Sequence, residues 1–174
     1  LKKSGYLPIP IPNNLISNLN QNKYSKKELK EYLKKIAPDG LLLTGGNNIG
    51  EYPARDNTEL LILEYAKENR IPLLAICRGM QLLAYSEGIK LFSVTGHVEK
   101  RHIVYGEINQ EVICFHNFSI RETPKNYKEI AYSKDGLIEG IRHNHLPIEG
   151  WMWHPERQEI FSEIDINRIK KLFC

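Results

Sequence analysis

The sequence of 174 residues lacks any long hydrophobic run, and its charges nearly cancel, with 24 basic and 21 acidic residues. No apolar stretch approaches the roughly 20 residues that a transmembrane helix needs, and no signal peptide is recognisable. The net charge of +3 is too small to predict a nucleic-acid surface. These features argue against membrane and nucleic-acid partners and predict one globular domain, residues 1–174.

Cysteine is also scarce. The sequence has three cysteines, Cys77, Cys114 and Cys174. Their odd number, at spacings that match neither a disulfide framework nor a metal motif, argues against both. Because free thiols are typical of reducing compartments, we expect a cytoplasmic protein.

The six histidines raise the question of a metal site. His97 with His102, and His143 with His145, are closely spaced pairs. No cysteine or carboxylate cluster completes a ligand set around them in the sequence. We therefore predict that these are surface or loop histidines, and that the protein uses no metal and no cofactor.

The first half of the chain alternates apolar runs with helical patterns. The apolar runs at 41–44 and 71–76 are typical of strands buried on both faces of a parallel sheet. A helical pattern follows each run, and this rhythm predicts βαβ units. The predicted helices of the whole chain cover 25–36, 56–69, 78–87 and 162–173.

The second half changes character, because short strand patterns separated by turns replace the helices. The predicted strands there cover 102–108, 111–115, 128–133, 137–142 and 148–153. Together the two halves predict an α/β fold. We expect a three-layer sandwich with a mostly parallel central sheet and with antiparallel strands in the C-terminal half.

Two predicted helix starts have the spacing of a capping box. Ser25 with Glu28, and Asp56 with Glu59, place an acidic residue three positions after a side chain that accepts hydrogen bonds. The asparagine-rich segment from Asn13 to Tyr24, before the first of these helices, is predicted to be a loop.

The stretch "PLLAICRGMQLL" places Cys77 between a predicted strand and a predicted helix. Such a turn strains the backbone, exposes its side chain and closes only if the residues two positions away are small. Ala75 and Gly79 meet that demand. The helix N-terminus, with Arg78 beside it, is expected to lower the pKa of the thiol. An inert core cysteine is the alternative at this point.

A cysteine nucleophile also needs a base and a group that orients the base. The stretch "WMWHPE" contains both, with His154 and Glu156 two positions apart. In an extended segment this spacing places the two side chains on one side. A polar surface turn is the alternative for this motif alone, but the cysteine turn and the His–Glu pair support each other.

Taken in order, "GLLLTGG", "PLLAICRGMQLL" and "WHPE" resemble the class I glutamine amidotransferase-like superfamily. The resemblance is strongest to its γ-glutamyl hydrolase or γ-glutamyl-GABA hydrolase type, and it runs from about Gly5 to the C-terminus. It implies that a first strand and a first helix of the family are missing before Leu1.

The resemblance implies a triad of Cys77, His154 and Glu156. In that family pattern the sulfur attacks the γ-carbonyl carbon of a glutamyl amide. His154 takes the proton and passes it to the departing amine, while Glu156 orients His154. Water then releases glutamate from a γ-glutamyl thioester.

The resemblance also implies an oxyanion hole and substrate contacts. Backbone N–H groups of Arg78 and of Gly46, or of its neighbour Asn47, are expected to bind the oxyanion. The candidates for substrate binding are Gln81, His116, Asn47 and Arg55. Arg55 belongs to "RDNTE", which resembles a segment that follows the glycine loop in the family.

The stretch "ICFHNFS" departs from the family. Relatives often carry an Asn-Ser-x-His-(His)-Gln pattern there, and only His116 matches it well. Cys114 replaces the serine and Phe118 replaces the glutamine. Contacts to the amino-acid end of a substrate are therefore the least determined part of the predicted site.

We expect a stand-alone enzyme that hydrolyses a small γ-glutamyl amide and requires no partner. Three substrate classes fit this chemistry. They are a γ-glutamyl nucleotide phosphoramidate, as in capsule or surface-polysaccharide synthesis, a γ-glutamyl polyamine product and a folate polyglutamate.

The first alternative function is a glutaminase subunit that supplies ammonia to a partner synthetase. A non-enzymatic binding module is the second. A redox or stress protein with a cysteine elbow is the third, and the downstream His-Pro-Glu argues against it.

Overall fold

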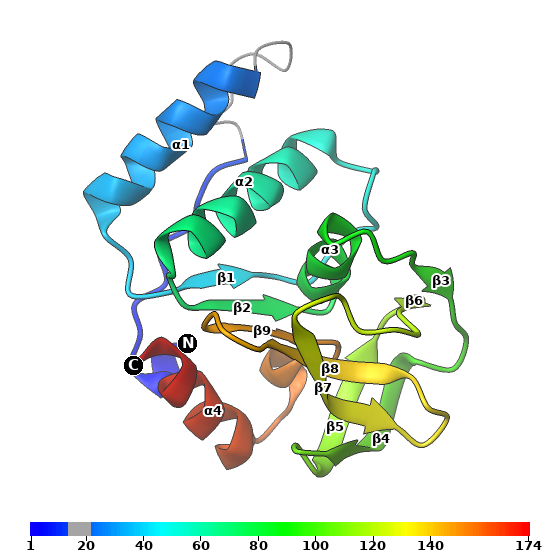
Figure 1. Ribbon diagram of the computed structural model, residues 1–174. Helices are drawn as coiled ribbons and strands as arrows, with labels where there is room; N and C mark the ends of the chain where they lie inside the picture. The colour runs from blue at the N-terminus through cyan, green and yellow to red at the C-terminus, as the bar shows by residue number, and fades with distance from the viewer. Residues whose placement is uncertain (14–21) are drawn as a thin grey trace.

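The computed structural model describes residues 1–13 and 22–174, without the side chains of 22–25. Helices cover both faces of a central sheet, with α1, α2 and α3 on one side and α4 on the other (Figure 1). The helical elements are η1 (Lys2–Ser4), α1 (Asn22–Ile36), α2 (Pro53–Asn69), α3 (Arg78–Ser86), η2 (Pro155–Arg157) and α4 (Glu163–Phe173). The predicted α/β class with three layers is confirmed.

The central sheet has seven strands in the order β1-β2-β9-β8-β7-β4-β5. Its strands are β1 (Leu41–Leu43), β2 (Leu73–Ile76), β4 (Val98–Gly106), β5 (Gln110–Phe115), β7 (Tyr127–Ser133), β8 (Ile138–His143) and β9 (Ile148–Trp151). A separate pair joins β3 (Phe92–Ser93) to β6 (Phe118–Ser119), which the sequence analysis did not predict.

The central sheet is mixed, so the prediction of a mostly parallel sheet is wrong. The β1–β2 and β2–β9 pairs are parallel, whereas the β9–β8, β8–β7, β7–β4 and β4–β5 pairs are antiparallel. Parallel neighbours need a long crossover, and the segments that join consecutive strands from β7 onward are too short to provide one. The C-terminal half therefore extends the sheet by short connections.

Strand β2 lies in the middle of the three parallel strands, and both of its faces are buried. Leu73 and Ala75 pack into the core beneath α1, α2 and α3, while Leu74 and Ile76 pack into the core on the α4 side. Alternate residues of one short strand therefore join two separate cores. This is the pattern expected for a strand covered on both faces.

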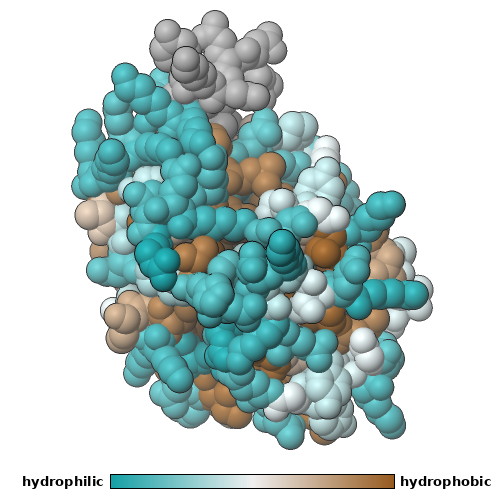
Figure 2. All heavy atoms as spheres, in the orientation of Figure 1, coloured by the Kyte–Doolittle hydropathy of each residue, from teal (hydrophilic) through white to brown (hydrophobic). Residues whose placement is uncertain are grey.

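Helix α1 begins at Asn22, so Ser25 lies inside the helix and its predicted role as the N-cap is wrong. Of the loop predicted before it, residues 14–21 lie outside the described part of the chain. An apolar stripe of this helix packs into the core, where Leu29 and Leu33 are buried. Hydrophilic residues cover the outer side of this helix (Figure 2). No described helix combines the length and apolar character needed to cross a membrane.

Helix α2 begins at Pro53 with Tyr52 as its N-cap, so Asp56 and Glu59 do not form the predicted capping box. Both carboxylates instead bind the guanidinium of Arg78, which is buried at the first turn of α3. A buried cation needs paired anions, because the interior solvates charge poorly. The interaction therefore fixes α3 against α2.

We expect Arg78→Met to destabilise the protein by about 3–5 kcal/mol, because buried Asp56 loses its counter-ion and buried Glu59 keeps only Arg55. Urea unfolding followed by circular dichroism measures this free energy. The control is Lys30→Met, which removes an ion pair to Glu68 on the partly exposed side of α1 and is expected to cost at most about 1 kcal/mol. Equal losses in the two variants would contradict the assigned role of the buried pair.

Candidate active site

The turn between β2 and α3 is strained at Cys77. Its backbone has φ 49° and ψ −105°, a conformation that residues with a side chain rarely adopt. The turn also brings α3 close to β1: a Cβ added at Gly79 would lie 2.6 Å from the carbonyl oxygen of Leu43. The backbone of the predicted elbow is therefore present, and a small residue at position 79 is a steric requirement. The predicted exposure of the Cys77 side chain is wrong, because the residue is buried.

The Cys77 thiol does not have the lowered pKa that the sequence analysis predicted. Burial, with 4% of the residue exposed, raises its pKa to about 11. The backbone N–H of Arg78 hydrogen-bonds the sulfur and lowers the pKa, whereas the carboxylates of Glu156 and Glu139 raise it. The Arg78 guanidinium is neutralised by α2, so it adds no positive field at the sulfur.

His154 and Glu156 contact each other as predicted, by a different backbone geometry. The Nδ1 atom of His154 lies 2.6 Å from Oε1 of Glu156. The chain is not extended here: His154 is the N-cap of the 3-10 turn η2, which contains Glu156. Burial raises the pKa of Glu156, but the hydrogen bond from His154, a backbone hydrogen bond and the nearby charges of His154 and Arg157 together hold that pKa below its usual value. The ionised carboxylate therefore fixes the proton on Nδ1 and leaves Nε2 as a base.

Strand pairing places the elbow beside the histidine segment. Ile76 pairs with Trp151, and the backbone N–H of Cys77 donates to the Trp151 carbonyl at 2.7 Å. Within the described residues the Cys77 sulfur and the His154 ring are not joined by a hydrogen bond. In free enzymes such catalytic contacts are often long and shorten when substrate binds.

Arg55 supports the glycine loop. Its guanidinium donates to the carbonyl oxygens of Thr44 and Gly45 at 2.9 and 3.0 Å, and to Glu59 at 2.8 Å. Gly46 has φ 149°, and a Cβ at this position would collide with the Arg55 guanidinium. Arg55 therefore positions the loop whose N–H groups were predicted to bind an oxyanion. Whether it also contacts substrate stays a prediction.

The His154 ring lies directly against the same loop. A Cβ added at Gly45 would lie 2.5 Å from Cε1 of the His154 ring, so only glycine leaves room for the imidazole there. Asn47 follows in the loop and is exposed. A cavity of about 680 Å³ borders this region, and its lining includes Gly46, His154 and Glu156 but not Cys77.

Gln81 and His116 share one acceptor. The Gln81 side-chain amide donates to the Phe118 carbonyl at 3.0 Å, and Nδ1 of His116 lies 3.1 Å from the same oxygen. Gln81 is buried on α3, one turn after Cys77. The side chain of His116 has no exposed surface and faces Glu139. Substrate contacts by either residue stay predictions.

The expectation that no ligand set surrounds the histidines is wrong. His97, His102, Cys114 and Glu139 have ligand atoms that all lie within 4.8 Å of one another. They come from the segment before β4 and from β4, β5 and β8, so no spacing in the sequence reveals the group. His97 is buried rather than on the surface. Only the pairing of antiparallel strands brings these residues together.

Comparison with known proteins establishes the family. The family model "Glutamine amidotransferase class-I" matches residues 13–162. The chain belongs to this family. The superfamily resemblance noted from "GLLLTGG", "PLLAICRGMQLL" and "WHPE" is thereby confirmed.

Two curated relatives illustrate the range of this glutamine amidotransferase family. The chain is 32% identical over 132 residues to the gamma-glutamyl-CDP-amidate hydrolase of Campylobacter jejuni, an alignment that covers 72% of this chain and 66% of that protein. It is 34% identical over 142 residues to one subunit of the glutamine-hydrolysing GMP synthase of Pyrococcus abyssi, covering 72% and 70%. The chain thus matches slightly less than two thirds of the Campylobacter protein.

Solved structures agree on the fold of the glutamine amidotransferase chain. A structure assigned as a GMP synthase subunit from Thermoplasma acidophilum superposes with a TM-score of 0.68 at 22% identity, covering 87% of this chain and 76% of that one. A glutamine amidotransferase from Thermotoga maritima gives 0.56 at 22% identity, covering 67% and 55%. At this identity the likeness establishes the fold alone.

We expect alkylation of Cys77 by iodoacetamide to be slow at neutral pH and to accelerate about tenfold per pH unit toward pH 11. The reason is that the reactive thiolate forms only near the raised pKa of about 11. Peptide-resolved mass spectrometry separates Cys77 from the exposed Cys174, which is the internal control. A Cys77 rate that is already constant below pH 7 would instead indicate a preformed thiolate.

Proposed function

We propose that the chain hydrolyses the C–N bond of γ-glutamyl amides through Cys77. The observation that supports this best is the combination of a strained cysteine turn with a His154–Glu156 pair on the adjacent strand end. Nucleophile, base and orienting group are the three parts that covalent acyl transfer needs. Family membership supports the same chemistry.

Because the pKa of the Cys77 thiol is raised, the base must remove the thiol proton during the reaction. At neutral pH Cys77 is protonated in the free protein, so Nε2 of His154 must accept the proton as the sulfur attacks the γ-carbonyl carbon. The C–S bond forms, the tetrahedral intermediate collapses, and His154 returns the proton to the departing nitrogen. Water then attacks the thioester with His154 as base, which releases glutamate and restores the thiol.

The charge that develops on the carbonyl oxygen needs donors. The Arg78 backbone N–H already points at the sulfur, and the Gly46 N–H lies in the loop held by Arg55. A donor pair of this kind typically accelerates acyl transfer by about 10²–10³ per donor. We therefore assign Arg78 and Gly46 as the oxyanion hole, through their backbones.

The leaving group proposed is a nucleotide phosphoramidate. The relative from Campylobacter jejuni is named a gamma-glutamyl-CDP-amidate hydrolase and shares 32% identity over 132 residues. With such a substrate the nitrogen that leaves is bonded to phosphorus, and the products are glutamate and the free amidate. The net charge of +3 does not oppose an anionic nucleotide.

The second candidate is a glutaminase subunit that supplies ammonia to a synthetase. It is supported by the relatives named as subunits of GMP synthase and as anthranilate synthase component 2. Both candidates use the same thioester chemistry. They differ in the amine released and in the need for a partner.

The triad proposal predicts distinct losses. Cys77→Ser and His154→Asn are expected to lose nearly all turnover, by about 10⁴-fold or more, because the nucleophile or its base is gone. Glu156→Gln is expected to lose less, because it only orients the ring. Glutamate release measures turnover, and Cys174→Ser is the matched control at an exposed thiol. Normal turnover in His154→Asn would eliminate this base.

A substrate comparison separates the two candidate functions. We expect the isolated protein to release glutamate from γ-glutamyl-CDP-amidate with a kcat/KM at least about 10²-fold above that for free glutamine. The expected reason is that nucleotide binding energy contributes only with the larger substrate. Rates on glutamine that are equal or higher, or that rise strongly on adding a synthetase, would favour the ammonia-supplying role.

A further inference from the structure

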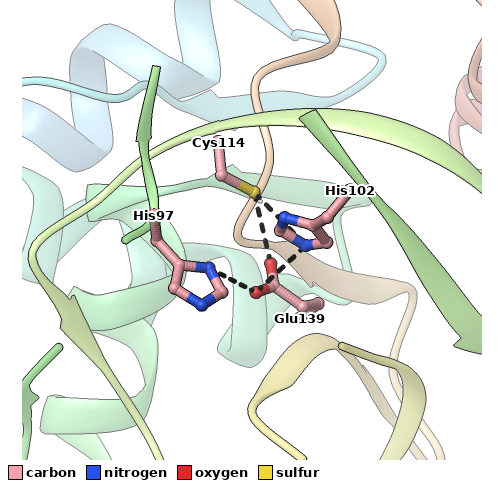
Figure 3. Close-up of side chains that lie close together, drawn as sticks. All are labelled: His97, His102, Cys114 and Glu139. Atoms are coloured by element: carbon pink, nitrogen blue, oxygen red, sulfur yellow. Dashed lines mark hydrogen bonds and ion pairs between the residues drawn. The ribbon is translucent and has the colours of Figure 1, made fainter. Parts of the chain in front are cut away.

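A buried cluster of metal-binding side chains lies on the antiparallel half of the sheet. It consists of His97 before β4, His102 on β4, Cys114 on β5 and Glu139 on β8. Their ligand atoms point toward one another around the Glu139 carboxylate (Figure 3). No step of the proposed hydrolysis uses any of these four side chains.

The ligand atoms of this cluster lie near the spacing of atoms that share a metal, and the Cys114 thiol also hydrogen-bonds the Glu139 carboxylate. Oε1 of Glu139 lies 3.5 Å from Nδ1 of His97 and 3.5 Å from Nε2 of His102. The Cys114 sulfur lies 3.5 Å from Oε2 of Glu139 and 3.9 Å from the same His102 nitrogen. Ligand bonds of about 2.0–2.3 Å in a tetrahedron put neighbouring ligand atoms about 3.3–3.7 Å apart.

His97 and His116 each make a hydrogen bond on the side of the ring that faces away from Glu139, and this bond orients the ring. Nε2 of His97 lies 3.0 Å from the Asp135 carboxylate. The ring of His116 packs against that of His97, and Nδ1 of His116 lies 3.1 Å from the Phe118 carbonyl. A carbonyl or ionised carboxylate only accepts, so these nitrogens carry the protons. When these rings are neutral, the opposite nitrogens face the Glu139 oxygen with lone pairs. Metal-binding histidines are typically oriented by such outer partners.

Three of the inward atoms are buried without a hydrogen-bond partner among the described residues. They are Nδ1 of His97, Nε2 of His116 and Oε1 of Glu139, and the side chain of Glu139 is 0% exposed. A buried carboxylate oxygen that faces only imidazole nitrogens at non-bonding distance requires a positive charge. A divalent cation at the centre of the cluster would supply it and would satisfy Nδ1 of His97 and Oε1 of Glu139, whereas His116 is not among the four ligands.

We propose that His97, His102, Cys114 and Glu139 bind one zinc ion. Two imidazoles, a thiolate and a carboxylate form a donor set that suits tetrahedral Zn²⁺. Binding displaces the thiol proton, and four protein ligands leave no open position, so the ion has a structural role. It joins β4, β5 and β8, while His116 forms part of the wall. This inference does not depend on the proposed hydrolysis.

The test is metal binding by the full chain after treatment with a chelator. We expect one Zn²⁺ per chain by calorimetry, and Co²⁺ to give tetrahedral d–d absorption with a thiolate charge-transfer band. Cys114→Ser should remove that band, whereas Cys77→Ser, Cys174→Ser and His145→Ala should retain it. Circular dichroism checks that each variant is folded.

Asp135→Asn provides a second variant that leaves the four ligands in place. Asp135 has a largely exposed side chain, so its replacement does not threaten folding. It should weaken Zn²⁺ binding about 10–100-fold, because His97 loses its orienting partner. Absence of stoichiometric Zn²⁺ and Co²⁺ binding in the wild type would overturn the proposal and leave protonated histidines as the counter-charge of Glu139. A charge-transfer band that survives in Cys114→Ser would overturn the assignment of the ligands.

Discussion

The parallel pairing of β2 with β9 is the constraint on which the rest of the candidate site depends. It aligns the end of one buried strand, where the chain turns at Cys77, with the end of another, where His154 follows. Both strands are covered on both faces, so neither end can shift without opening a core. The 3-10 turn after β9 then folds Glu156 back onto the imidazole. Two segments far apart in the sequence thus form one chemical unit.

Burial sets the electrostatics of this unit. The site contains an arginine next to Cys77, yet Asp56 and Glu59 neutralise its charge. The thiol is therefore surrounded by apolar atoms and by the more distant carboxylates of Glu156 and Glu139, which keep it protonated. In such an environment the thiol stays neutral unless a base removes its proton, and this is the task that the proposed function gives to His154.

The antiparallel half adds a second polar centre close to the first. Glu139 belongs to the histidine and cysteine cluster and also raises the pKa of the Cys77 thiol, so the field of one centre reaches the other. His116 and Gln81 meet at the Phe118 carbonyl, which connects the segment after β5 to helix α3, the helix that follows Cys77. The sheet therefore positions the candidate triad and holds the cluster of metal-binding side chains in the same fold.

Local pattern was sufficient for the four α-helices, for most strands of the central sheet and for the motifs of the candidate triad, but not for the short β3–β6 pair. The features that were predicted each span only a few residues, and periodicity and steric requirements at that scale can be recognised in a sequence. They are the apolar runs of β1 and β2, the stripe of α1, the small residues around Cys77 and the His-Pro-Glu segment. Tertiary structure alone decided four other features. They are the mixed sheet, the Arg78 ion pairs, the raised pKa of the Cys77 thiol and the grouping of His97, His102, Cys114 and Glu139. Each depends on which distant residues become neighbours and on how much water they exclude, and no local spacing encodes either.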